Sequence, residues 1–171
     1  MKTLILMRHA KAAPLRPGER DFDRCLTESG LERTAESVKH LKEAGIHIDS
    51  LLASAARRTM QTAQAVAEVL CPDTPFHALD ELYLASPESY LTAVSQYAED
   101  HFQTAFVVGH NPGIGSLMCG LANRGLEVPT ATTCVFEFSA DSWCDLSEFR
   151  HQRPKTRLKL MILRGEVVAE N

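Results

Sequence analysis

The segment Thr3–Met7 constrains the fold most, because five largely apolar residues run together and are cut off by Arg8. Unbroken apolar runs of strand length are typical of strands covered on both faces, as in the parallel sheets of α/β proteins. Similar short runs occupy Ser50–Ala53 and Ala105–Val108, and Phe76–Leu79 is predicted to be another strand. The sequence therefore predicts a buried sheet with helices on both sides.

Segments with helical periodicity lie between these runs. Apolar residues recur at helical spacing after Thr27, which is typical of an N-cap, and Gly45 stands where that helix would end. A second helix is predicted to continue to Leu70, and Ser86-Pro87-Glu88 is typical of the start of a third. Further along we expect a helix over residues 113–123 and two late strands, Thr133–Phe138 and Leu158–Leu163. The sequence does not specify which strands these two pair with, or in which direction.

This alternation of strands and helices favours an α/β protein. We predict a three-layer αβα sandwich with a mainly parallel sheet. No repeat, low-complexity tract or linker divides the 171 residues, so one domain over residues 1–171 is expected.

Composition excludes several classes of function. The chain is 44% hydrophobic and 23% charged, with a net charge of −4, so neither disorder nor a nucleic-acid partner is indicated. No apolar stretch approaches the length of a membrane span, and the short run after Lys2 is not a signal peptide. The five cysteines are scattered, without metal-binding spacing, which favours a reducing cytoplasm and no bound metal; an oxidation-sensitive role for Cys25 stays open.

Cationic and imidazole side chains follow three of the predicted strands. The first strand ends at Arg8 and His9, the second is followed by Arg57 and Arg58, and the fourth ends at His110. In a parallel sheet the carboxyl ends of strands share one edge, where ligands bind. Arginine forks match phosphate oxygens in pairs, so this convergence predicts a site for a compact, strongly negative group such as phosphate.

Any one of these residues alone could be an ordinary solvated or structural side chain. The functional interpretation depends on their shared position at one edge of the predicted sheet. The remaining histidines show no metal-ligand spacing and are interpreted as surface residues: His40, His47, His77, His101 and His151.

Three motifs in order resemble the histidine phosphatase superfamily, which has the phosphoglycerate mutase-like fold. They are Arg8-His9-Ala10, the stretch from Ser54 to Ala63 that contains Arg58-Thr59 and Gln61-Thr62, and Gly109-His110-Asn111-Pro112. Alanine and lysine after Arg8-His9, together with Asp23-Arg24 before Leu26-Thr27, are similar to the phosphohistidine phosphatase SixA branch.

The resemblance implies a role for each matched residue. His9 would be the nucleophile that carries the phosphoryl group, Arg8 and Arg58 would bind its oxygens, and His110 would complete the pocket. Arg58 is chosen over its neighbour Arg57 because of its spacing from Ser54 and Gln61. Arg24 and Asn111 are further candidates for substrate binding.

A general acid is a separate question, set by the leaving group. An alkoxide leaves poorly without protonation, whereas an imidazole leaves more readily. Family members that act on alcohol esters typically carry a glutamate after the third strand, which makes Glu81 the first candidate for a general acid and Glu88 the second.

Three functions remain open from the sequence. The first is a metal-independent phosphatase, without a cofactor, for phosphohistidine on a protein of the histidine phosphotransfer type. The second is a small-molecule phosphomonoesterase of the same superfamily that acts on a small phosphate ester. The third is a non-catalytic phosphate-binding signalling module, which would need the arginines but not His9.

Overall fold

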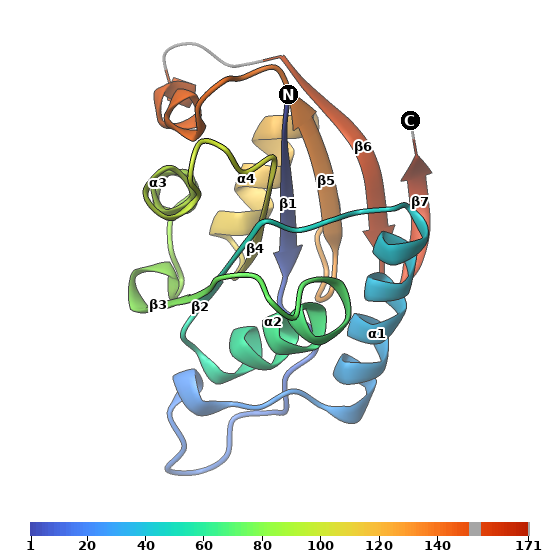
Figure 1. The fold of residues 1–171 in the computed structure, drawn as a ribbon. Coiled ribbons are helices and arrows are strands. Elements are labelled where there is room, and N and C mark those ends of the chain that lie inside the picture. The colour runs from blue at the N-terminus through green and yellow to red at the C-terminus, as the bar shows by residue number, and fades with distance from the viewer. Residues whose placement is uncertain (151–154, 171) are drawn as a thin grey trace.

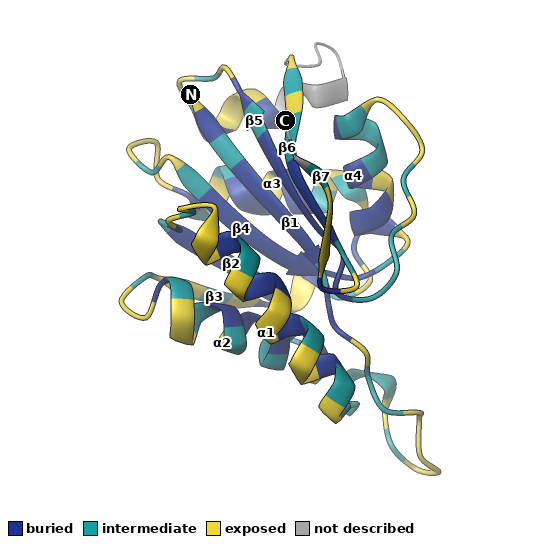
Figure 2. Ribbon diagram, turned by 90° about the vertical axis from the view of Figure 1, so that its right-hand side faces the viewer, coloured by how far each residue is buried: buried dark blue, intermediate teal, exposed yellow. Residues whose placement is uncertain are grey.

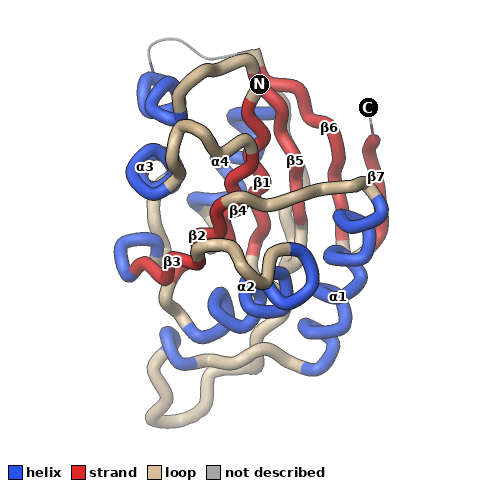
Figure 3. Tube along the Cα trace, in the orientation of Figure 1, coloured by secondary structure: helices blue, strands red, loops and turns tan. Residues whose placement is uncertain are grey.

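A computed structural model describes residues 1–150 and 155–170, and it places a sheet of seven strands between two layers of helices (Figure 1). Figure 3 shows the same arrangement by type of secondary structure. In chain order the elements are β1 (Lys2–Arg8), the 3-10 turn η1 (Asp21–Asp23), α1 (Glu28–Glu43), β2 (Ser50–Ser54), α2 (Arg57–Leu70), β3 (Phe76–Leu79), the 3-10 turn η2 (Asp80–Leu82), α3 (Pro87–Tyr97), β4 (Thr104–Gly109), α4 (Gly113–Ala122), β5 (Thr133–Phe138), η3 (Trp143–Arg150), β6 (Thr156–Leu163) and β7 (Glu166–Glu170).

The sheet is mixed, so the prediction of a mainly parallel sheet is supported only in part. Its strand order is β3-β2-β4-β1-β5-β6-β7. The strands from β3 to β1 pair in parallel, whereas β5, β6 and β7 add to the far side of β1 in antiparallel pairs. Only Arg164 and Gly165 lie between β6 and β7, and so short a connection requires antiparallel neighbours, whereas η3 lies between the antiparallel strands β5 and β6. The α/β class and the sandwich of three layers are confirmed.

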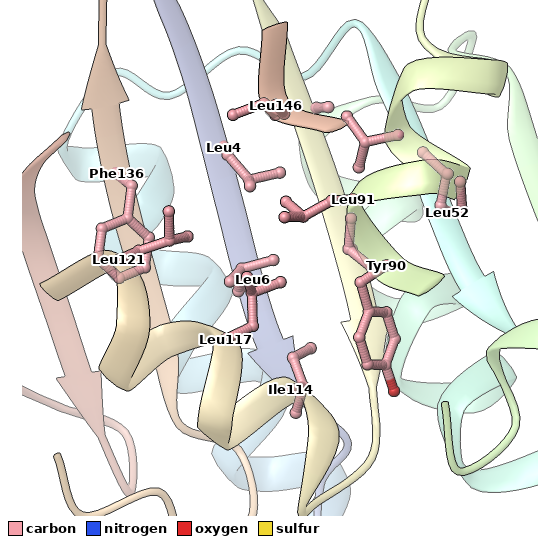
Figure 4. Packing of buried hydrophobic residues seen from close by; sticks show 14 of the residues in the cluster. Leu4, Leu6, Leu52, Tyr90, Leu91, Ile114, Leu117, Leu121, Phe136 and Leu146 are labelled. Atoms are coloured by element: carbon pink, nitrogen blue, oxygen red, sulfur yellow. The ribbon is translucent and has the colours of Figure 1, made fainter. Parts of the chain in front are cut away.

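Both faces of the central strands are buried, which explains the unbroken apolar run at the start of the chain. Leu4 and Leu6 pack on one side with residues of α3 and α4, whereas Ile5 and Met7 pack on the other side with residues of α1 and α2. This alternation follows from the two-residue period of a strand. Figure 4 shows the first of these two clusters, and Figure 2 shows buried strands behind a largely exposed outer face of α1.

The ends of the helices follow the predicted capping signals. The Thr27 side chain accepts a hydrogen bond from the Gly30 amide at 3.1 Å, and Ser86 does the same for Ser89 at 3.2 Å. Gly45 follows α1 with a φ of 69°, which glycine adopts without the steric cost of a side chain. The side-chain caps mark the residues at which α1 and α3 begin.

Of the histidines interpreted as surface residues, His47 and His101 are exposed and His40 and His77 are half-buried, while His151 lies outside the described residues. Among the described residues no helix is both long and apolar enough to cross a membrane.

Candidate active site

A cavity of about 320 Å³ opens at the carboxyl ends of β1, β2 and β4. Strand register brings these ends together, because Arg8 at the end of β1 lies opposite Gly109 at the end of β4. The long segment after β1 loops out beyond this end of the sheet (Figure 1). The cavity is lined by Arg8, His9, Lys11, Ala12, Asp21, Arg24, Arg58, Leu84, His110, Asn111 and Thr130.

His9 is buried at the floor of the cavity, and a hydrogen bond fixes one of its two ring nitrogens. Its Nδ1 donates a hydrogen bond to the carbonyl of Ala10 at 2.8 Å. Because a carbonyl only accepts, the proton is on Nδ1, and Nε2 carries the lone pair. The amide of Ala10 donates in turn to Thr62 Oγ1 at 3.1 Å. The backbone after β1 therefore holds the imidazole in the tautomer that leaves Nε2 as the nucleophilic atom.

The loop after His9 is held tightly against the start of α1. The Lys11 carbonyl accepts from the Thr27 amide at 2.9 Å. A Cβ added at Gly30 would lie 2.4 Å from that carbonyl oxygen, so only glycine fits at this point of α1. This close approach explains a glycine three residues after the N-cap, and it places Lys11 at the wall of the cavity.

Arg58 is almost fully buried and contacts both histidines. Its Nε donates to His9 Nε2 and its Nη2 lies against His110 Nδ1, each at 3.3 Å. Arg57, one residue earlier, is exposed. The structure thus brings Arg58, and not Arg57, to the predicted position beside the nucleophile candidate.

His110 is held by two contacts in addition to that of Arg58. Its Nε2 lies 2.9 Å from Ser54 Oγ, and its backbone amide donates to the hydroxyl of Tyr90 at 2.9 Å. In Figure 4 the Tyr90 hydroxyl points in the same direction as strand β1, toward the carboxyl ends of the parallel strands. A Cβ at Gly109 would lie 2.5 Å from that hydroxyl, so the glycine before His110 leaves room for the tyrosine.

Arg8 and Asn111 share an anchor at the rim. The Arg8 Nη1 and the Asn111 Nδ2 both donate to the carbonyl of Val128, at 2.9 and 3.0 Å. Arg8 Nε and Asn111 Oδ1 are buried without a hydrogen-bond partner among the described residues. Since buried polar atoms are normally paired, the free N–H of Arg8 is a donor available to a bound anion.

Both imidazoles are neutral over the physiological pH range. Burial is the main cause that lowers the pKa of His9 to about 4. The Ala10 carbonyl, the second-largest effect, opposes this shift, and the nearby Arg58 and Arg8 add to it. Burial, His9 and Arg58 lower the pKa of His110 to about 3. A neutral imidazole is the nucleophilic form, so the arginines that would bind a phosphoryl group also keep His9 ready to attack it.

Sequence reasoning missed Asp21, the one carboxylate among the described residues that line the cavity. Its Oδ2 accepts from Tyr83 at 2.6 Å and from Arg58 at 2.9 Å, and its Oδ1 accepts from Arg24 at 2.8 Å. These donors, Tyr83 foremost, hold the pKa of Asp21 well below its usual range. The signal in the sequence was the spacing of Asp21, three residues before Arg24.

The structure does not bring the predicted acid to the cavity. Glu81 is exposed on η2 and is absent from the lining, and the second candidate, Glu88, is exposed in the first turn of α3. Among the described residues no group of three or more metal-ligating side chains is assembled. The cysteines also stand apart from the lining, with Cys25 half-buried in the segment before α1.

The fold and this cavity define an α/β protein with a neutral histidine and three arginines at the carboxyl edge of its sheet. The family model of the histidine phosphatase superfamily (branch 1) matches residues 4–88. The chain belongs to this superfamily, as its motifs predicted.

Solved structures of SixA proteins agree with this family, and one curated protein is also similar to the chain. The SixA protein of Agrobacterium tumefaciens, a candidate phosphohistidine phosphatase, is 28% identical, with a TM-score of 0.79 over 95% of this chain and 97% of its own. The candidate SixA of Nakamurella multipartitia is 26% identical, with a TM-score of 0.80 over 98% and 97%. An uncharacterised chloroplastic protein of Arabidopsis thaliana is 24% identical over 83% of this chain and 69% of its own.

Proposed function

We propose that the protein hydrolyses phosphohistidine on a partner protein of the histidine phosphotransfer type, through a phosphohistidine intermediate on His9. The observation that carries the proposal is the pairing of a neutral His9, whose Nε2 faces Arg58, with a cavity whose only described carboxylate is held ionised. Such a site can accept a phosphoryl group but has no carboxylic acid with which to protonate a leaving group.

In the first step, the lone pair of His9 Nε2 attacks phosphorus and the phosphorus–nitrogen bond of the substrate breaks. The leaving imidazole departs as a neutral ring when its other nitrogen carries a proton, so it takes the bonding electron pair without an acid from the enzyme. His9 keeps its own proton on Nδ1, which donates a hydrogen bond to the Ala10 carbonyl. Phosphoryl transfer then needs in-line placement and charge neutralisation, which Arg8, Arg24 and Arg58 would supply.

In the second step, water attacks the phosphorus on His9, the bond to Nε2 breaks, and phosphate leaves with the oxygen and both protons of the water. The electron pair returns to Nε2, and the imidazole is again neutral. Because three arginines neutralise the equatorial oxygens, we propose that neither step requires a metal ion or another cofactor.

An alcohol ester would be a poor substrate for the same reason. An alkoxide has to be protonated as it leaves, and Asp21 cannot donate a proton at neutral pH, because its pKa lies well below its usual range. The similarity to candidate SixA phosphohistidine phosphatases supports the same choice of leaving group. We propose a cytoplasmic location, since five scattered cysteines suit a reducing compartment.

The test compares wild type with His9→Ala on a radiolabelled phosphohistidine protein and on sugar phosphates, with and without EDTA. Exposed His47→Ala serves as the matched control. We expect wild type and His47→Ala to release phosphate from phosphohistidine regardless of EDTA, and His9→Ala to lose more than about ten thousandfold. Release from sugar phosphates alone would replace the proposal with a phosphomonoesterase, and an inactive wild type that binds phosphate would indicate a binding module.

A further inference from the structure

Arg58 uses its two hydrogen-bonding edges for different partners. The edge formed by Nε and Nη2 faces His9 Nε2 and His110 Nδ1, each at 3.3 Å. The end formed by Nη1 and Nη2 is bound by Asp21, whose backbone carbonyl accepts from Nη1 at 2.6 Å and whose Oδ2 accepts from Nη2 at 2.9 Å. A planar guanidinium held by its end presents its side edge in one direction. That edge points at the nucleophile candidate.

Asp21 is itself held by groups other than Arg58. Tyr83, directly after η2, donates to Oδ2 at 2.6 Å, and Arg24 donates to Oδ1 at 2.8 Å. Arg24 is fixed in turn by the carbonyl of Ala13 at 2.8 Å. A carboxylate with donors from three side chains has little rotational freedom, so it can orient Arg58 before any substrate arrives.

Charge gives Asp21 a second effect. The described lining of the cavity carries four cationic side chains, Arg8, Lys11, Arg24 and Arg58, against this single carboxylate. Phosphate, the product, fits the same cationic groups as the transferred phosphoryl group. Interactions that bind product and transition state equally do not raise the turnover rate, and slow release of product lowers it.

We propose that Asp21 is a positioning residue that aims Arg58 at His9 and offsets cavity charge, so that phosphate is released rapidly after each turnover. The proposal rests on the phosphatase function above, but its two parts can be measured separately. Asp21→Asn removes the charge and keeps one acceptor oxygen, which in the place of Oδ2 can still accept from Arg58 and Tyr83, while its amide nitrogen replaces the oxygen that accepts from Arg24. Asp21→Ala removes both the charge and the anchor. Both substitutions fall on a surface turn where the side chain is 39% exposed, so the fold is expected to tolerate them.

The matched control is Asp23→Asn. Asp23 lies on the same turn and loses the same charge, but its partner is exposed Arg20, at 2.6 and 2.9 Å, and it does not line the cavity. Any effect of net charge alone will therefore appear equally in Asp21→Asn and Asp23→Asn.

The experiment measures binding of inorganic phosphate by calorimetry at low salt, and kcat on a phosphohistidine protein. For Asp21→Asn we expect phosphate to bind about tenfold more tightly while kcat falls about tenfold, a combination that loss of structure would not produce. Asp21→Ala should bind phosphate more weakly than Asp21→Asn and lose about a hundredfold in kcat, because Arg58 is no longer aimed. Asp23→Asn should match wild type in both measurements.

Phosphate binding that is unchanged or weaker in Asp21→Asn would overturn the proposal, as would an equal gain of affinity in Asp23→Asn. If wild type leaves phosphohistidine intact, the proposed function fails, yet the calorimetric comparison still decides whether Asp21 limits anion affinity. The two measurements therefore test the phosphatase function and the role of Asp21 separately.

Discussion

Two short 3-10 turns, η1 and η2, both contain acidic residues, yet they contribute different chemistry to the cavity. From η1, Asp21 reaches into the lining and is held ionised. From η2, Glu81 stays exposed, and Tyr83, two residues later, donates its hydroxyl to Asp21 instead. The difference shows that an acidic residue near a site need not be a proton donor, because Asp21 lines the cavity with a lowered pKa and Glu81 lies outside the lining.

Among substitutions in and next to the two turns, the largest effect is expected from the arginine that joins η1 to the histidines. Arg58→Ala should reduce kcat/KM on phosphohistidine by about a thousandfold, because the side chain contacts His9, His110 and Asp21. Exposed Arg57→Ala, one residue earlier, should stay within about twofold of wild type. Steady-state kinetics of the two variants checks this contrast, and equal losses in both would remove Arg58 from the site.

Acid should destabilise the protein through the two imidazoles. The unfolded chain binds a proton on each ring below a pH of about 6.5, whereas folded His9 does so only near 4 and folded His110 near 3. The unfolded state therefore binds more protons in this window, so stability falls as pH drops from about 6.5 to 4, by up to about 1.4 kcal/mol per pH unit for each ring.

Urea unfolding between pH 7 and 4.5 measures this slope. His110→Asn should make it shallower by about one proton. A slope in wild type that is independent of His110 would contradict the neutral state of that imidazole.

A smaller effect is expected within the segment after β3. Tyr83→Phe removes the hydroxyl that donates to Asp21 at 2.6 Å and should lower kcat about tenfold. Glu81→Gln, two residues earlier, should change turnover by less than about twofold on phosphohistidine and on esters alike, since its side chain is exposed outside the lining. Kinetics on both substrate types tests this, and a selective loss of ester hydrolysis in Glu81→Gln would restore Glu81 as an acid.

The residues at the ends of the parallel strands were the most predictable from the sequence. Apolar runs of strand length mark the buried strands, and the parallel pairing of β1, β2 and β4 then brings Arg8, Arg58 and His110 together. The antiparallel strands β5, β6 and β7 were harder, because partner and direction of late strands depend on tertiary packing, and β7 was not predicted.

Networks of side chains from turns far apart in the chain could not be predicted from the sequence. Asp21 and Tyr83 are 62 positions apart and meet only because η1 and η2 approach the same end of the sheet. Glu81 matched a family pattern by position, but whether its side chain faces the cavity depends on the local turn, which spacing alone does not specify. The carbonyl that fixes the His9 tautomer, that of Ala10, is likewise a backbone contact that residue spacing does not specify.

The most direct test of the proposed mechanism is the dependence of turnover on the leaving group. A series of aryl phosphates, alkyl phosphates and phosphoramidates can be assayed with wild type at pH 7. Without a protonating acid in the cavity, the rate should fall by about tenfold or more for each few units of leaving-group pKa, with phosphoramidates fast and alkyl phosphates nearly inert. Alkyl phosphates hydrolysed as fast as aryl phosphates would show that a general acid acts, and would contradict this mechanism.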